Sequence, residues 1–147
     1  MKKMLLLMGV VISVGLAGCG QQQEPAEASA FDFQGTLIGD APGVGRLRSL
    51  AGIEDVGFTL STQTPPYGVT FHEVDNTKEE LLYASALLFL TIPNVDWIVF
   101  DQGDGELEVG RTEIMDFLEG EEFADESQLA DFITRKVNAD GLPGFIH

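Results

Sequence analysis

The chain has 147 residues and a formal net charge of −16, with 24 acidic side chains against 8 lysines and arginines. This length fits one folded domain, and the charge argues against binding to nucleic acids or to anionic lipid headgroups. The charge favours cationic partners, divalent ions or a high-salt environment, unless it serves only as a solubilising surface. The single cysteine, Cys19, leaves no pair for an internal disulfide bond, so packing has to stabilise the fold.

The N-terminus has the pattern of a secretory signal. Lys2 and Lys3 precede an apolar run over residues 4–18, and small residues lead into Cys19. The Leu-Ala-Gly-Cys ending favours lipidation of the thiol over simple secretion, for which an Ala-x-Ala ending is more typical. A membrane-spanning anchor is the other alternative, but a helix of this length rises only about 22 Å, against a bilayer core of roughly 30 Å. We therefore expect a lipoprotein signal peptide over residues 1–18 and a diacylglyceryl group, with acyl chains such as palmitate, on Cys19.

A short spacer and one domain are expected after the signal. Residues 19–30 comprise the lipidated cysteine and a segment with almost no large apolar side chain, which is typical of disordered spacers. Large apolar residues begin at Phe31, so we expect a single domain over residues 31–147. Cleavage before Cys19 would also remove two lysines and make the mature chain more negative still.

A short helix is the first element expected in the domain. Asp40 is a suitable N-cap, Pro42 is tolerated in the first turn, and an apolar stripe continues to Leu50. The glycines at 43 and 45 form no phosphate-binding loop, because no apolar strand leads into them and the third glycine of that motif is missing.

A hairpin is expected next. Apolar and polar residues alternate over residues 56–61 and again over 67–71, which is the period of half-buried strands. A proline-rich turn over residues 64–66 connects the two strands. His72 falls on the polar side of the second strand and is interpreted as an ordinary surface residue, not as a base or a metal ligand.

The centre of the domain is predicted to be a helix over Leu81–Ile92. This segment is apolar on almost every side, which is typical of a buried helix, and Pro93 ends it. A second membrane segment is the alternative interpretation, but the stretch is too short to span a bilayer.

A second hairpin follows this helix. Residues 95–100 are apolar on both faces, which favours a central strand, and residues 106–109 form its partner. The turn Asp101–Gly105 has the composition of a calcium loop, but it lacks a ligand at the third offset and the closing glutamate. We therefore predict no metal site and no cofactor.

Two helices are expected at the C-terminus, one from Thr112 to about Gly120 and one from Ser127 to about Val137, with a loose tail to His147. The order helix, hairpin, helix, hairpin, helix, helix predicts an α+β fold. In such a fold an antiparallel sheet of about four strands carries helices mainly on one face.

Several of these segments are similar to a known family. The motifs are Gly39-Asp40, Val44-Gly45, Gly57-Phe58-Thr59-Leu60, Pro66-Tyr67-Gly68-Val69-Thr70 and Asn94-Val95-Asp96. Over residues 36–136 they resemble the domain of unknown function family 4825, with Leu37 where an aromatic residue is expected and Val69 where leucine is expected. The resemblance implies an extracytoplasmic lipoprotein or membrane protein of a Gram-positive bacterium, and it implies no activity.

Two classes of function stay open on the sequence alone. The first is a non-catalytic lipoprotein that binds or senses a protein or a cationic partner at the cell surface. The second is a hydrolase-type enzyme with paired surface carboxylates, such as Asp101 and Asp104. We expect the first class, because no catalytic motif is recognisable, with acylated Cys19 holding the chain on the extracytoplasmic face of the cell membrane.

The best candidates for a partner contact are Pro65, Pro66, Tyr67 and Gly68. A stiff proline turn can present an aromatic ring at low entropic cost, and a glycine beside it lets another backbone approach closely. The alternative is that Tyr67 folds back onto the sheet and the turn is structural.

Overall fold

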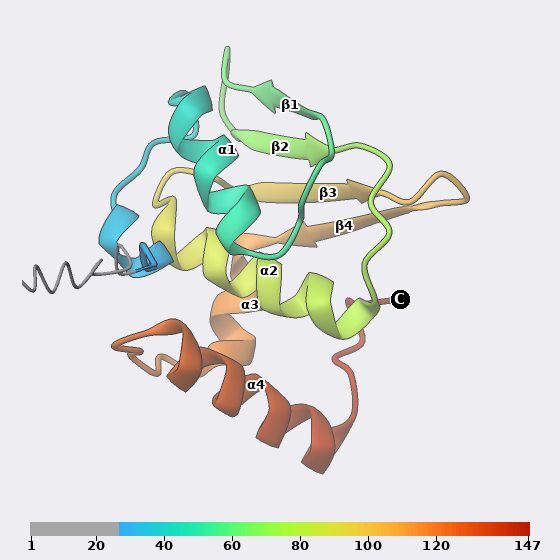
Figure 1. Cartoon of the computed structure of the whole chain (residues 1–147). Helices are drawn as coiled ribbons and strands as arrows, with labels where there is room; N and C mark the ends of the chain where they lie inside the picture. The colour runs from blue at the N-terminus through green and yellow to red at the C-terminus, as the bar shows by residue number, and fades with distance from the viewer. Residues whose placement is uncertain (1–26) are drawn as a thin grey trace, which may run out of the picture.

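The computed structural model describes residues 27–147, and Figure 1 shows a four-stranded sheet with helices packed against it. The order of the main elements is helix, hairpin, helix, hairpin, helix, helix, which confirms the α+β class. The predicted signal peptide, Cys19 and the first part of the spacer lie outside the described residues.

The sheet contains β1 (Phe58–Ser61), β2 (Gly68–Phe71), β3 (Trp97–Asp101) and β4 (Glu106–Gly110), in that spatial order. Both hairpins are antiparallel as expected, but the central β2–β3 pair is parallel, so the sheet is mixed rather than wholly antiparallel. The long helix between the hairpins is the reason. It forms a crossover that returns the chain to the end of the sheet where β2 began, so β3 runs in the same direction as β2.

One face of the sheet is apolar and covered. The registers align two rows of side chains across all four strands, namely Phe58, Phe71, Phe100 and Leu107, and Leu60, Val69, Ile98 and Val109. The rings of Phe71 and Phe100 stack with their centroids 5.7 Å apart. Thr59 and Glu108, which alternate with these rows, are exposed, so the helices lie mainly on one face, as predicted.

Helix α2 (Lys78–Thr91) is the buried centre of the domain. It begins with a capping box in which Thr77 and Glu80 exchange hydrogen bonds, and nearly every later side chain is buried. Its two buried hydroxyls are satisfied within the helix, since Ser85 donates to the Leu81 carbonyl and Thr91 donates to the Leu87 carbonyl. No helix between residues 27 and 147 is both long and apolar enough to cross a bilayer.

The other helices surround α2. Helix α1 (Ala41–Leu50) begins at the predicted cap, where the Asp40 carboxylate accepts from the Gly43 N–H at 3.2 Å. Helix α3 (Arg111–Leu118) follows β4 directly, and α4 (Glu126–Asp140) lies beyond α2 on the side away from the sheet (Figure 1).

The end of α2 is held by Arg111, a residue that the sequence did not single out. Its guanidinium donates to three carbonyls, those of Val95 at 2.7 Å, Phe89 at 3.0 Å and Ile92 at 2.5 Å. It also lies over the Phe89 ring at 5.1 Å. Burial lowers the pKa of Arg111. One cation therefore joins the negative end of α2, the loop after it and the start of α3.

Both ends of the described chain are more ordered than the sequence suggests. The C-terminal tail is not loose, because Ile146 is fully buried and the Phe145 ring meets Phe117 edge to face. At the other end, the hydroxyl of Ser29 and the N–H of Ala30 donate to the Glu126 carboxylate of α4. These contacts lie slightly before residue 31, the expected start of the domain.

Candidate functional site

The predicted contact residues form the turn between β1 and β2. Pro65 and Pro66 are exposed, and the peptide bond between them is cis. Tyr67 is half-buried and packs against the core. Its N–H donates to the Asp96 carboxylate at 2.7 Å, while its carbonyl accepts from the Asp96 N–H at 2.7 Å. Tyr67 therefore ties the turn to the start of β3 and does not stand clear of the sheet.

Gly68 is buried beneath the side chain of Trp97. The two residues are partners in the parallel pair, and a Cβ at position 68 would lie 2.1 Å from carbons of the indole ring. The Trp97 Nε1–H donates to the Pro66 carbonyl at 3.2 Å. The space beside Gly68 is thus filled by a ring of the same chain rather than left for a partner. Of the four predicted contact residues, only the two prolines are exposed.

A row of three polar side chains lies on the uncovered face of the sheet. Thr59 Oγ1 is 2.8 Å from His72 Nε2, and His72 Nδ1 is 3.8 Å from the Asp101 carboxylate. The sequence paired Asp101 with Asp104 and treated His72 as isolated, but the structure places His72 beside Asp101, across the β2–β3 pair. The order hydroxyl, imidazole, carboxylate is that of a catalytic triad.

This row is poorly suited to catalysis. The separation of His72 and Asp101 is too long for a hydrogen bond, and both side chains remain accessible to water. A strand side chain on an open sheet face has no shielded position in which a developing oxyanion could be stabilised. The arrangement therefore supports a polar surface more than an acyl-transfer site.

A groove with a volume of about 490 Å³ lies between α1, α2 and α4. This volume is in the range of small-molecule sites. Its apolar lining includes Leu50, Tyr83, Ile133 and Val137, and its polar lining includes Glu79 and Glu80. Sequence reasoning missed it because its walls come from three segments far apart in the chain, none of which carries a recognisable motif.

The groove has an acidic rim and no basic side chain in its lining. Hydrogen bonds from the Thr77 N–H and hydroxyl and from the Asn76 amide lower the pKa of Glu80 despite some desolvation, so this carboxylate is ionised near neutral pH. Glu79 is exposed beside it and forms no ion pair with any residue from 27 to 147.

The phenol of Tyr83 lies in the same groove and stays neutral. Burial raises its pKa, and the negative charge of Glu126 raises it further. A neutral phenol in a partly buried position offers one polar contact without adding charge.

Comparison with known proteins identifies no relative. No family model matches the chain, and no curated protein or solved structure matches it. The resemblance to family 4825 stays a prediction. Within residues 27–147, no three histidine, cysteine or acidic side chains gather closely enough to hold a metal ion. The function is therefore argued from the residues themselves.

Proposed function

We propose that this chain is a lipid-anchored binding module on the extracytoplasmic face of the cell membrane. The observation that carries the proposal is the stretch Leu16-Ala17-Gly18-Cys19 at the end of a short apolar run with a basic start. The only cysteine of the chain stands at the one position where a lipoprotein signal requires it.

The charge of the domain fits a lipid anchor. A strongly acidic domain is repelled by anionic lipid headgroups, so electrostatic attraction cannot hold it at a membrane. A single acyl chain gives only marginal membrane binding, whereas two or more chains hold a protein stably. A diacylglyceryl group on Cys19 would supply that anchor, and the spacer would let the domain stand away from the surface.

The binding role is supported by the groove between α1, α2 and α4. Apolar side chains form much of its lining, acidic and amide side chains lie among them, and most of the lining residues belong to helices. An apolar lining with polar groups among it is usual for a site that holds a small molecule.

The anchor is tested with Cys19→Ala, using Gln22→Ala in the spacer as a matched control. We expect the first variant to incorporate no labelled palmitate and to leave the membrane fraction, and the control to behave like the parent chain. Unchanged labelling of Cys19→Ala would exclude lipidation at this residue.

A second candidate function, ester or amide hydrolysis, is favoured by the 2.8 Å contact between Thr59 and His72. It predicts that His72→Ala and Thr59→Val each abolish hydrolysis of an activated ester such as p-nitrophenyl acetate. The binding module predicts instead that Thr59→Val leaves the rate unchanged, because any slow reaction would come from the exposed imidazole alone.

A further inference from the structure

The walls of the groove between α1, α2 and α4 are rigid. Leu50 closes α1, Tyr83 belongs to the buried helix α2, and Ile133 and Val137 lie one turn apart on α4. Sites on helices hold their shape better than sites on loops, so an apolar ligand would lose little free energy to ordering of the protein.

Two carboxylates set the sign of the potential at the rim. Glu79 and Glu80 lie in the first turn of α2, and no basic side chain lines the groove to balance them. Glu80 is hydrogen-bonded into the capping box, while Glu79 has no partner of that kind within residues 27–147. Because the floor beneath them is apolar and of low dielectric, the field of these charges is focused into the groove.

The C-terminal ends of two helices make the potential in the groove more negative. The C-terminal turns of α1 and α4 both border the groove, and the aligned backbone dipoles of a helix place about half a negative charge at this end. Helix α4 has no basic residue in its last turn, whereas the last turn of α1 contains Arg48, whose guanidinium donates to the Val56 carbonyl. The N-terminus of α2 contributes an opposite half charge and Lys78, its first residue, contributes a full one, but the two glutamates of the same turn outweigh them.

From this geometry we infer that the groove binds a small organic cation with an apolar body, such as a primary amine carried on a hydrocarbon or aromatic group. The inference rests on the proposed binding function and narrows it to one ligand class. The apolar body would lie on Leu50, Ile133 and Val137, and the cation would lie between Glu79 and the face or hydroxyl of Tyr83. An anionic ligand of the same shape would be repelled.

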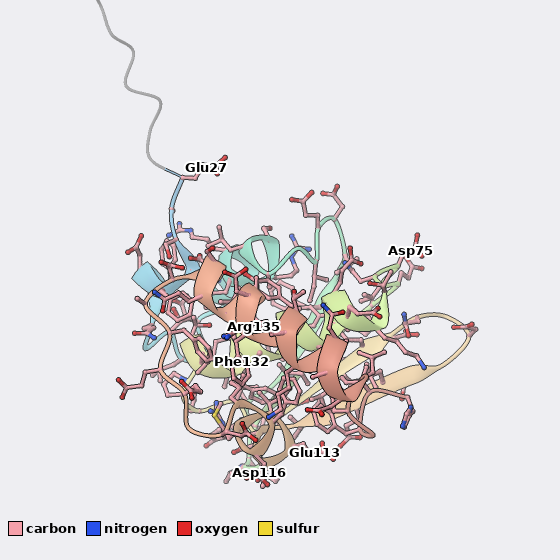
Figure 2. All side chains as sticks on the ribbon, turned by 90° about the horizontal axis from the view of Figure 1, so that it is seen from below. Glu27, Asp75, Glu113, Asp116, Phe132 and Arg135 are labelled. Carbon is pink, nitrogen blue, oxygen red and sulfur yellow. The ribbon has the colours of Figure 1, made fainter. Side chains whose placement is uncertain are left out.

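One side of the groove, at Asn76, lies near an edge of the domain. Figure 2 places Asp75, next to the rim residue Asn76, at the edge opposite Glu27, where the described chain begins. The described chain therefore begins away from this side of the groove.

The test uses three fluorescent probes with the same body and different charge: dansylcadaverine, which is a cation, the neutral dansyl pentylamide, and the anion dansyl-6-aminohexanoate. The full chain is held in phosphatidylcholine nanodiscs, with empty nanodiscs as the blank. Trp97 is the only tryptophan, so dansyl emission sensitised by tryptophan reports probe bound to the protein rather than probe dissolved in lipid. We expect the order of affinity to be cation, then neutral probe, then anion.

Two variants with the same net charge test whether the cation binds at the groove, and a third variant fills it. Glu79→Gln removes a rim carboxylate, and Glu108→Gln removes an exposed carboxylate on the uncovered face of the sheet. We expect Glu79→Gln to weaken binding of the cation roughly twofold to fivefold and to leave the neutral probe unchanged, as for a partly exposed ion pair. Glu108→Gln should change neither. Thr134→Phe, which fills the groove from an exposed position on α4, should weaken binding of the cation and of the neutral probe together.

The outcomes separate this inference from the proposed function. Equal losses in Glu79→Gln and Glu108→Gln would mean that the diffuse surface charge attracts the cation, and would overturn the inference. Equal affinity for all three probes would leave the groove as a binding site but exclude a cationic ligand class. Binding that is insensitive to Thr134→Phe would exclude the groove as the binding site. The lipid anchor is tested separately, by the labelling of Cys19→Ala.

Discussion

Arg111 provides the sharpest test of how this domain is held together. Its guanidinium donates to the carbonyls of Val95, Phe89 and Ile92 with distances between 2.5 and 3.0 Å. Replacing it with methionine keeps an apolar stem of similar length but removes the charge and all the donors. The three carbonyls at the end of α2 and in the loop after it would then lose their partner.

The expected cost follows from these contacts. A hydrogen bond to a charged group contributes about 1.5–3 kcal/mol net, and leaving a buried carbonyl unpaired costs about 1–3 kcal/mol. The three hydrogen bonds share one side chain, so their contributions are not additive. The site is only half-buried, so water can donate to some of the carbonyls that lose the guanidinium. We expect Arg111→Met to lower the free energy of unfolding by about 3–5 kcal/mol, a large share of the roughly 5–15 kcal/mol of a typical domain.

Urea unfolding followed by circular dichroism measures this loss directly. The matched control is Arg135→Met on α4, whose guanidinium is exposed and reaches only the Asp131 carbonyl of its own helix. That change should shift stability by less than about 0.5 kcal/mol. A loss below about 1 kcal/mol in Arg111→Met, similar to the control, would show that the end of α2 does not depend on this cation.

Three further outcomes are expected. Gly68→Ala should lower the free energy of unfolding by about 1–3 kcal/mol and alter tryptophan fluorescence, because the new Cβ would overlap the Trp97 ring. The control Gly105→Ala, with no atom near its Cβ, should change neither. Equal thermal midpoints for the two variants would refute this close packing. Leu87→Ala should cost about 2–5 kcal/mol in urea unfolding, since Leu87 is fully buried, and an unmoved midpoint would place α2 outside the core. Burial alone would raise the pKa of Glu126, but the hydrogen bonds from Ser29 and Ala30 outweigh burial and lower it. The stability from this carboxylate is therefore present above pH about 4.5 and is lost as the pH falls through the lowered pKa of the folded state. Glu126→Gln should therefore flatten the acid side of the stability profile, and an unchanged profile would mean that the N-terminal segment is not held by this charge.

Much of the fold was accessible from the sequence because its signals are local. The alternation over 56–61 and 67–71 marks β1 and β2, and the apolar stretch over Leu81–Ile92 marks α2. Asp40 caps α1 in the structure as its position suggested. Each of these features depends on residues only a few positions apart, so periodicity and capping chemistry are sufficient to find them.

The candidate site was less accessible. The sequence indicated Pro65–Gly68 as a contact surface, but the roles of Tyr67 and Gly68 depend on Asp96 and Trp97, about thirty residues away. The parallel pairing of β2 and β3 likewise depends on the path of the crossover through α2, which no local pattern specifies.

By itself, the sequence determined the α+β class and the positions of the main helices and strands, and it predicts a lipoprotein signal that leads into Cys19. Only the tertiary structure decided that Trp97 covers Gly68, that Arg111 joins the end of α2 to α3, and that three distant helices enclose an acidic groove. The physical reason is that secondary structure responds to neighbours along the chain. Cavities, clamps and ring contacts instead arise from side chains that meet only after the elements have packed.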